Sequence, residues 1–370
     1  MQLTLHLTNQ CNLSCNYCFV KRGPERMSQE VAYAAVKLGM DNKNTSGLLF
    51  YGGEPLLERQ LIYDVVNYTK DIRKKTGHTF YYKVTTNGTL IDEEFLKFAN
   101  DANMTIGFSC DGPAQDDCRS FHDGTGSLAA LEEKIPLLLA HQPYAIGMSV
   151  VDPSTVEKAA EVVEYLYKKG FRYIHMGVNY SKVAPWTKER LLTLANEYNK
   201  IAQMYINWTR AEEKIYFSSF DMKILSHLKG EKYNIDRSKM NMNQPSVAPN
   251  GKIYPMSKHL NNPVFEIGDV FSGIDKEKQK AIYEKGAVPA EPCRKCAIKS
   301  RCNYAYDNLG NNGLTIVDDV TAVQCSHERL ITPIADYVAQ TLFKQQNAMF
   351  IQKHYNDLYP VMSLLEDSGL

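Results

Sequence analysis

Hydrophobic and polar residues follow a repeating order along the first 212 residues of the chain. Short runs rich in branched and aromatic residues are each followed by a longer run in which apolar residues recur at helical spacing. Strands are predicted at residues 3–8, 47–51, 80–85, 105–109, 145–151 and 173–178. Helices are predicted at residues 28–41, 61–74, 93–100, 127–140 and 188–208, and another opens at the capping-box pattern of residues 154–157.

This order predicts an α/β fold. Six successive strand–helix units indicate a parallel sheet, since parallel neighbours need a crossover connection. Right-handed crossovers would curl that sheet into a partial (β/α)6 TIM barrel over residues 1–212. Residues 213–243 are predicted to be a polar linker with a short helix near 222–228. A small α+β domain is expected at 244–330, followed by a C-terminal helix at 330–349 and a tail to residue 370.

Composition narrows the class of protein. The chain has 370 residues with 42 basic and 42 acidic side chains, so no basic excess suggests nucleic acid. No apolar run reaches the length of a membrane span, and the first residues run directly into a strand rather than a signal peptide. Nine cysteines in such a chain predict a reduced, cytoplasmic protein in which metal binding is favoured over disulfides.

Three of these cysteines, Cys11, Cys15 and Cys18, follow the first predicted strand at x3 and x2 spacing. Three thiolates can hold three irons of a cubic iron–sulfur cluster, which leaves the fourth iron open to a small molecule. A zinc knuckle or a set of free core thiols would also fit three closely spaced cysteines.

Polar motifs follow the next predicted strands. The Gly52-Gly53-Glu54-Pro55 turn comes after the second strand, Asn87 after the third, and Ser109 and Asp111 at the end of the fourth. The carboxyl ends of parallel strands meet at one face of a barrel, where sites are built. These motifs are therefore expected to gather beside the three cysteines.

A second cysteine group lies near the C-terminus. Cys293, Cys296 and Cys302 have x2 and x5 spacing, and Cys325 follows after 22 intervening residues. Four thiolates can saturate a [4Fe–4S] cluster, although four-cysteine zinc sites also use x2 spacing. We favour iron–sulfur here and expect residues 244–330 to be a small α+β iron–sulfur domain.

The first motif resembles the radical S-adenosylmethionine (SAM) superfamily, whose signature is Cys-x3-Cys-x2-Cys with an aromatic residue, here Tyr17, before the last cysteine. The resemblance implies that the open iron binds SAM and that the cluster cleaves it to a 5′-deoxyadenosyl radical. It further implies SAM contacts, which on matching positions of this chain are Gly52, Gly53, Glu54, Asn87, Ser109 and Asp111. Arg119 is a candidate for the SAM carboxylate because a guanidinium fork matches a carboxylate, and a solvated loop arginine is the alternative.

The C-terminal region resembles the SPASM domain of anaerobic sulfatase maturases and peptide maturases. The full SPASM pattern has seven cysteines and two auxiliary clusters, but Met256 and Tyr306 stand at two of its ligand positions here. The resemblance therefore implies one auxiliary cluster, held by the C-terminal four cysteines, and two [4Fe–4S] clusters in all. Sulfatase maturases also carry a catalytic Asp where this chain has Ser257, which disfavours sulfatase maturation.

The sequence thus predicts a radical SAM enzyme that modifies a side chain of a ribosomally made peptide or protein. Crosslinking, oxidation, epimerisation and ring formation remain open. The proton acceptor or hydrogen-atom donor is expected among six residues near the site: Asp111, Cys118, Tyr254, Ser257, Lys258 and His259. By its alternation with Ser109 and Asp111, Cys110 is expected to be a core thiol.

Other functions stay open at this point. A radical SAM dehydrogenase of a small alcohol or sugar and an anaerobic sulfatase maturase are alternative enzymes, and a non-catalytic iron–sulfur or zinc scaffold is an alternative of another class. The expected partners are a peptide or protein substrate and a flavodoxin- or ferredoxin-type reductant, with neither nucleic acid nor membrane.

Overall fold

The computed structural model describes residues 1–40, 44–181, 183–242, 244–289, 291–304 and 322–368. Its centre is a parallel sheet whose six main strands lie in the order β1-β3-β4-β5-β7-β8. Each lies within a few residues of its predicted position, so the parallel sheet is confirmed. The six strands are β1 (Gln2–His6), β3 (Thr45–Tyr51), β4 (Thr79–Thr86), β5 (Met104–Ser109), β7 (Ile146–Val151) and β8 (Tyr173–Val178).

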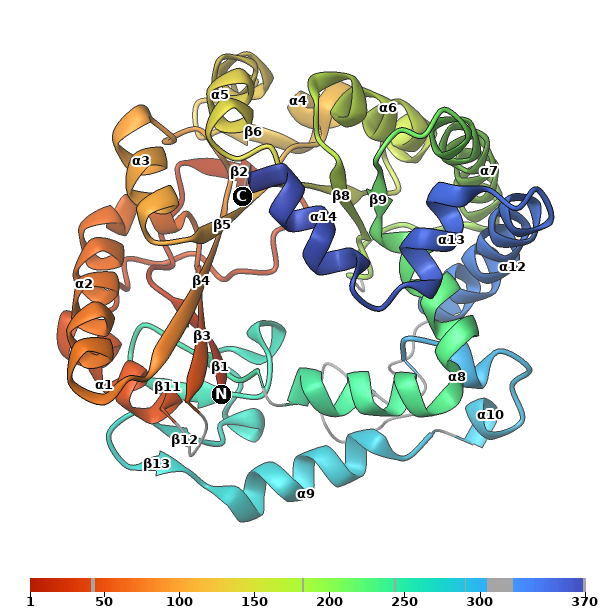
Figure 1. The fold of residues 1–370 in the computed structure, drawn as a ribbon. Helices are drawn as coiled ribbons and strands as arrows, with labels where there is room; N and C mark the ends of the chain where they lie inside the picture. The colour runs from red at the N-terminus through yellow and green to blue at the C-terminus, as the bar shows by residue number, and fades with distance from the viewer. Residues whose placement is uncertain (41–43, 182, 243, 290, 305–321, 369–370) are drawn as a thin grey trace.

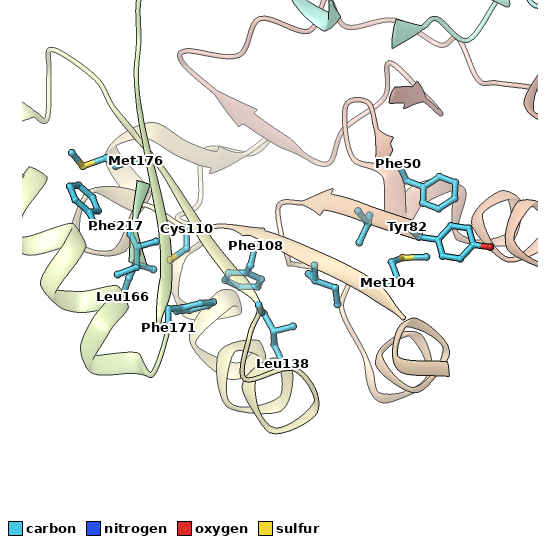
Figure 2. Close-up of a cluster of buried hydrophobic side chains, with 14 of the residues drawn as sticks. Phe50, Tyr82, Met104, Phe108, Cys110, Leu138, Leu166, Phe171, Met176 and Phe217 are labelled. Atoms are coloured by element: carbon cyan, nitrogen blue, oxygen red, sulfur yellow. The ribbon is translucent and has the colours of Figure 1, made fainter. Parts of the chain in front are cut away.

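Helices cover the outer face of this curved sheet (Figure 1). They are α1 (Gln29–Gly39), α2 (Arg59–Thr76), α3 (Glu93–Asp101), α5 (Leu128–His141), α6 (Ala159–Lys169) and α7 (Lys188–Arg210). Alternate strand residues such as Phe50, Tyr82 and Phe108 are buried between the sheet and the helices (Figure 2). Cys110 lies in this core and is fully buried, as predicted.

The start of α6 differs from the prediction. The hydroxyl of Ser154 donates to Asp152 Oδ1 at 2.6 Å instead of capping a helix. A 3-10 turn, η3 (Val156–Lys158), then precedes α6. Asp152 therefore takes the serine hydroxyl that was expected to cap the helix, because short polar side chains readily form hydrogen bonds with near neighbours in the chain.

The sheet continues beyond the barrel in both directions. Strand β10 (Ser246–Val247) pairs in parallel with β1, and β11 (Lys252–Tyr254) pairs antiparallel with β10. Two short strands, β12 (Gly268–Asp269) and β13 (Gly273–Ile274), extend this edge. The hairpin of β10 and β11 is therefore an extension of the barrel sheet, which places residues after β11 beside the end of β1.

The segment predicted to be a linker is mostly helical. Strand β9 (Tyr216–Phe217) pairs with β8, and α8 (Ser218–Met242) follows, interrupted at Gly230, whose φ is +72°. The predicted short helix is one part of α8. Its inner face is buried at Phe220 and Ile224, which accounts for a helix longer than its weak apolar periodicity indicates.

The C-terminal part of the chain is helical and lies against the barrel. Its helices are α9 (Lys276–Ala287), α10 (Glu291–Arg294), α12 (Ala322–Lys344), α13 (Ala348–Tyr355) and α14 (Tyr359–Ser368). The predicted single helix at 330–349 is divided, since α12 ends at Lys344 and Asn347 caps α13. In Figure 1, α14 crosses the open interior, and Tyr173 at the start of β8 bonds Ser363 at 3.0 Å. Among the described helices, none is long and apolar enough to cross a membrane.

Candidate active site

The first three cysteines lie on the loop between β1 and α1, which is fastened to the segment after β5. A short strand of the loop, β2 (Leu13–Cys15), pairs antiparallel with β6 (Arg119–Phe121), so that Cys15 lies opposite Arg119. The Asn16 amide donates to the Cys118 carbonyl at 3.0 Å, and His122 donates to the Cys11 carbonyl at 2.7 Å. The cysteine loop is therefore held by the same segment that carries Arg119.

The glycine pair after β3 supports this loop from its other side. The Gly53 amide donates to the Thr8 carbonyl at 2.7 Å, and the Glu54 amide donates to Gln10 at 2.8 Å. A Cβ atom on Gly53 would lie 2.0 Å from the Gln10 carbonyl oxygen, far inside contact distance. The sequence suggested that SAM contacts these glycines. In the structure, the backbone of the cysteine loop is what comes close to Gly53.

Glu54 connects the ends of two strands. Its fully buried carboxylate accepts from the Thr86 hydroxyl and the Asn87 amide, both at 2.7 Å, and from the Leu56 amide at 3.0 Å. Burial raises the pKa of Glu54 to about 7, although all three hydrogen bonds act in the opposite direction. This carboxylate therefore fixes the turn after β4 relative to the turn after β3.

Asn87 connects the turn after β4 to the cysteine loop. Its side-chain amide donates to Asn12 Oδ1 at 2.8 Å and lies 3.8 Å from Cys11 Sγ. Its oxygen accepts from the Thr89 hydroxyl at 2.7 Å. The Asn-containing turn predicted from sequence thus contacts the first cysteine directly.

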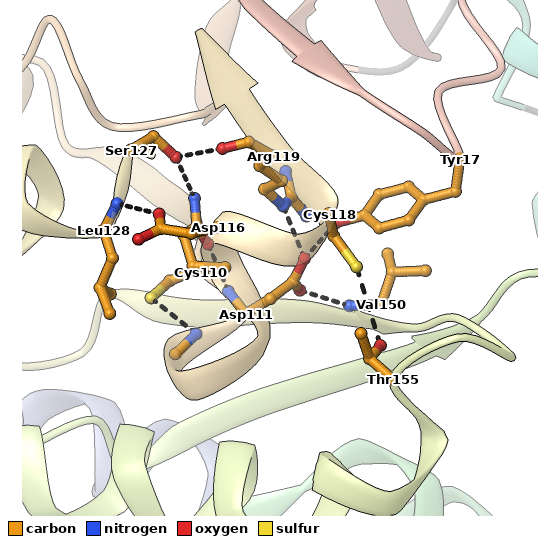
Figure 3. A network of polar contacts seen from close by, with 12 residues as sticks. Tyr17, Cys110, Asp111, Asp116, Cys118, Arg119, Ser127, Leu128, Val150 and Thr155 are labelled. Carbon is orange, nitrogen blue, oxygen red and sulfur yellow. Dashed lines mark hydrogen bonds and ion pairs between the residues drawn. The ribbon is translucent and has the colours of Figure 1, made fainter. Parts of the chain in front are cut away.

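A buried polar network surrounds Asp111 (Figure 3). Its carboxylate accepts from Arg119 Nε at 2.8 Å, from the Val150 amide at 2.9 Å and from the Tyr17 hydroxyl. Burial lowers the pKa of Arg119, but Asp111 and Tyr17 outweigh this and hold it well above its ordinary value. The guanidinium carbon also lies 5.2 Å from the centre of the Tyr17 ring. The sequence motif after β5 is therefore joined to the aromatic residue of the cysteine motif.

These contacts place most of the predicted cofactor residues at the carboxyl ends of β1, β3, β4 and β5. Within the described residues, the two terminal nitrogens of Arg119 have no hydrogen-bond partner. Burial raises the pKa of Cys11 to about 11 and also raises that of Cys15, so a metal would be needed to hold them as thiolates. Three thiols beside a charged guanidinium fit a cluster with an open iron and an anionic ligand.

The six candidates for the proton acceptor or hydrogen-atom donor lie in different surroundings. Cys118, at the end of α4 (Gln115–Cys118), is buried with its sulfur 3.7 Å from the Thr155 hydroxyl. Tyr254 belongs to a small hydrophobic cluster on the hairpin, and His259 stacks on Phe265 at 3.9 Å between ring centres. Lys258 is exposed. The Asp111 side chain bonds Tyr17 of the cysteine loop.

Ser257 lies beside the barrel through a residue that sequence reasoning missed. His6, at the end of β1, is buried, and its Nε2 is 2.9 Å from Ser257 Oγ. Ser246 Oγ lies 3.0 Å from the same hydroxyl. Burial lowers the pKa of His6 to about 3, which keeps its ring neutral. The available signal was its place in the alternating first strand, where Leu3 and Leu5 face the helices and His6 does not.

The other four predicted ligands line one pocket. Cys293, Cys296, Cys302 and Cys325 surround it together with the cationic residues Lys299 and Arg329. Cys293 belongs to α10, and Cys296 lies between α10 and the turn η6 (Lys299–Arg301). Cys302 directly follows η6, and Cys325 lies in the first turn of α12. Among the described residues, no three His, Cys, Asp or Glu side chains converge on a point for a single metal ion. Four thiols with cations at the wall suit the donor set of an anionic thiolate-bound cluster.

A buried ion pair holds this thiol pocket against α8. Lys223 Nζ contacts Glu328 Oε2 at 2.5 Å and donates to the Arg301 carbonyl at 2.9 Å. The same carboxylate oxygen accepts from the Asn303 amide, and Arg301 pairs with Asp336 at 2.6 Å. The segment predicted to be a linker therefore supplies the residue that anchors both halves of the pocket. Tyr306, which stands at a SPASM ligand position in the sequence, lies outside the described residues.

A larger cavity, of about 420 Å³, lies at the other end of the barrel. Tyr173 and Tyr216, at the starts of β8 and β9, line it together with α13 and α14 residues such as Lys353. Because parallel barrels carry their chemistry at the carboxyl ends of the strands, this cavity is separate from the site described above.

Comparison with known proteins agrees with this geometry. The model of the radical SAM superfamily matches residues 5–180. The serine-type anaerobic sulfatase-maturating enzyme of Bacteroides thetaiotaomicron is 21% identical over 392 residues, covering 94% of this chain and 93% of its own. The cysteine-type enzyme of Clostridium perfringens is 23% identical over 339 residues, covering 83% of this chain and 89% of its own.

The fold has solved counterparts. A structure described as native anSMEcpe with bound AdoMet and Cp18Cys peptide superposes with a TM-score of 0.77 at 18% identity, covering 93% of this chain and 99% of that one. A radical SAM domain implies SAM and a [4Fe–4S] cluster as cofactors. Residues 5–180 are therefore a radical SAM domain, and this chain is a radical SAM enzyme related over most of its length to the anaerobic sulfatase-maturating enzymes.

Proposed function

We propose that this enzyme binds SAM at the carboxyl ends of β1, β3, β4 and β5 and modifies a side chain of a peptide or protein. The observation that carries the proposal is the continuous set of contacts from Cys11 through Asn87 to Glu54, and from Cys15 through Arg119 to Asp111. The peptide substrate is supported by the names of the relatives, which mature a protein, and by the related structure that holds a peptide.

Cys11, Cys15 and Cys18 would hold the first cluster, with Tyr17 fixing the loop. When bound, the cluster and SAM supply a 5′-deoxyadenosyl radical that removes a hydrogen atom from an unactivated carbon. The protein's own task is to orient the groups. Glu54 and Asn87 hold the turns that face the cofactor, with Gly52 and Gly53 bringing the cysteine loop against β3.

Arg119 is the candidate for the SAM carboxylate, because its two terminal nitrogens form the fork that matches a carboxylate. Asp111 then has a positioning role. Its two oxygens accept three hydrogen bonds, so it orients Arg119 and Tyr17 rather than collecting a proton from the substrate. Ser109, at the end of β5, would complete this side of the SAM site.

We propose a second, auxiliary [4Fe–4S] cluster on Cys293, Cys296, Cys302 and Cys325. With four protein thiolates it would have no open iron, so it would stabilise the region or relay an electron without binding substrate. The cationic residues Lys299 and Arg329 at the pocket wall support an anionic occupant. The enzyme would then contain two clusters, receive electrons from a flavodoxin- or ferredoxin-type protein, and work in the cytoplasm, where thiols stay reduced.

Among the proton-handling candidates from the hairpin, Ser257 contacts a barrel strand, through His6 of β1. Its hydroxyl lies 2.9 Å from Nε2 of His6, whose neutral ring can accept a hydrogen bond from it. Tyr254 and His259 would support the hairpin core instead. Sulfatase maturation is a second candidate because the relatives with near full-length coverage carry that activity in their names.

The test is anaerobic reconstitution followed by separate assays for 5′-deoxyadenosine and for modified substrate. Candidate substrates are short peptides encoded beside the gene and sulfatase-derived peptides. Single replacements of Asp111, Cys118, Tyr254, Ser257, Lys258 and His259 are then compared. We expect Ser257→Ala to form deoxyadenosine normally while product is lost or diverted.

Three outcomes would count against this proposal. Absence of SAM cleavage by the reconstituted wild-type protein would remove its basis. Oxidation of a small alcohol or sugar with no peptide modified would favour the dehydrogenase alternative. Normal product from the Ser257→Ala variant would remove Ser257 from the chemistry.

A further inference from the structure

The interior face of the barrel sheet is polar at positions where parallel barrels ordinarily carry branched apolar side chains. Residues that alternate with the buried core positions face this interior. On β4, Tyr82 and Val84 are buried against the helices, so Lys83 between them faces inward. On β8, Ile174 and Met176 are buried, so His175 between them faces inward as well.

The neighbouring strand makes room for the Lys83 side chain. Gly107 on β5 pairs with Thr85, and its missing side chain would point to the same interior face. A Cβ atom at Gly107 would lie 3.5 Å from Lys83 Cε and 2.7 Å from Met148 Sδ. The Lys83 side chain therefore lies close to Gly107, which Met148 also approaches. The Lys83 side chain is half-buried.

Lys83 has no counterion among the residues that the structure describes. Within the described residues it forms neither an ion pair nor a hydrogen bond. Burial lowers its pKa, and no carboxylate acts against that burial. Nδ1 of His175 forms a hydrogen bond with Ser218 Oγ at a distance of 3.0 Å. The pKa of His175 is lowered mainly by burial and further by the positive charge of Lys83. A half-buried cation without a partner costs stability, so its presence calls for a ligand.

The position suits a substrate group. Lys83 precedes Asn87, at the cofactor end of the same strand, by four residues, which corresponds to about 13 Å at the rise of a β-strand. A peptide whose reacting carbon lies at the SAM end could reach this depth with one long side chain or with its terminus. Oxygen anions are the groups that an ammonium binds in such a place.

We propose that Lys83 binds a carboxylate of the substrate inside the barrel, so that this enzyme selects acidic peptides. The inference rests on the proposed peptide substrate and specifies that this peptide carries a negative charge. The carboxylate could belong to an Asp or Glu side chain or to the C-terminus of the peptide, and both have the same chemistry at Lys83.

The experiment measures binding of four fluorescent pentapeptides to the anaerobically reconstituted holoenzyme with SAM. Two peptides, Ala-Ala-Glu-Ala-Ala and Ala-Ala-Gln-Ala-Ala, carry amidated C-termini and differ only in the side chain. The other two are penta-alanine with a free and with an amidated C-terminus. The proteins are the wild type, Lys83→Met, Lys83→Arg and the control Lys74→Met, whose lysine is exposed on α2 and paired with Asp71.

We expect at least one carboxylate peptide to bind the wild type about tenfold or more tightly than its amide partner, as a charge-assisted bond predicts. The pair that shows the difference identifies the source of the carboxylate. Lys83→Met should remove the difference, Lys83→Arg should keep part of it, and Lys74→Met should keep all of it. Lys83→Met should also raise the midpoint of thermal unfolding, because it removes a half-buried cation that has no partner among the described residues.

Two results would overturn the inference, and they are distinguishable. Equal binding of acid and amide peptides, or an undiminished difference in Lys83→Met, refutes the role of Lys83 and leaves the peptide substrate intact. Binding of none of the peptides by a protein that cleaves SAM counts against a peptide substrate and therefore against both proposals.

Discussion

The two cysteine groups of this enzyme are built in different ways. The first lies on a loop at the carboxyl ends of the barrel strands and supplies three thiols. Side chains from three neighbouring strand ends surround it, among them Asn87 and Arg119. The second supplies four thiols to one pocket between α10, η6 and α12, held by the Lys223–Glu328 ion pair.

This difference separates an open site from a closed one. At the first group the protein provides one thiol fewer than a cubane has irons, and it provides a guanidinium with two unoccupied nitrogens nearby. At the second group the thiols suffice, and the polar side chains around them bond one another. If each group holds a cubane as proposed, a small molecule can bind an open iron at the first and not at the second. We therefore assign the chemistry to the first group and a supporting role to the second.

The largest effect expected from this comparison follows removal of the first group. Replacing Cys11, Cys15 and Cys18 together by Ala should abolish deoxyadenosine formation. Iron should fall from about eight to about four atoms per chain, because one of two cubanes is lost. Iron and sulfide analysis with a SAM cleavage assay tests this. A wild-type protein with near twelve irons, or with zinc at the C-terminal cysteines, would contradict it.

The closed group is tested through its anchor. Lys223→Met leaves Glu328 buried without its cation, which should cost about 3–5 kcal/mol of stability in this region. The variant should lose about four irons, one cubane, yet continue to cleave SAM.

Two matched variants complete that test. Lys223→Met combined with Glu328→Leu should recover part of the loss, since it removes both charges. Lys229→Met breaks only the exposed pair with Asp357 and should change stability by at most about 1 kcal/mol. Loss of SAM cleavage in Lys223→Met would show that the two groups are not separate.

The open group is sharpened by Asp111→Asn. The buried Arg119 would lose its carboxylate but keep an amide oxygen, so the expected cost is about 3 kcal/mol, at the low end for a broken buried pair. SAM affinity should fall because the guanidinium loses its orientation, while the four C-terminal cysteines keep their iron. Equilibrium SAM binding and denaturant unfolding measure the two effects. Asp117→Asn, which breaks an exposed pair with Lys158, is the control and should bind SAM normally.

The smallest effect is a pH dependence in the closed region. His327 lies between the Tyr180 and Tyr198 hydroxyls, and burial lowers its pKa to about 4, with Glu328 raising it and Lys223 lowering it further. Between pH 6.5 and 4 the unfolded chain binds a proton that the folded chain does not, so stability falls as pH falls.

The comparison is made with His327→Gln. The stability advantage of the wild type over this variant should shrink by about 1.4 kcal/mol between pH 7.5 and pH 5.5, which is one unit below the unfolded pKa. Urea unfolding under anaerobic conditions at both values measures it. An advantage that is constant or grows toward pH 5.5 would show that His327 is charged in the folded protein.

The sequence by itself determined the barrel and the positions of both thiol groups. Alternation and helical spacing predict the six main strands because one face of each must meet a helix layer, and that requirement is local. The motifs around Glu54, Asn87 and Asp111 could be assigned to one site because the carboxyl ends of parallel strands meet at one face. The spacing of the cysteines along the chain is enough by itself to suggest that they are cluster ligands.

Only the tertiary structure decided which side chains meet. It showed that Gly53 accommodates the cysteine loop, that Asp111 is occupied by three donors, and that α8 supplies the anchor of the second pocket. It also placed His6 against Ser257, 251 residues apart in sequence, and gave Lys83 no counterion within the described part of the chain. These facts depend on strand register, helix docking and burial, which arise from contacts between distant segments, and no local pattern of residues carries that information.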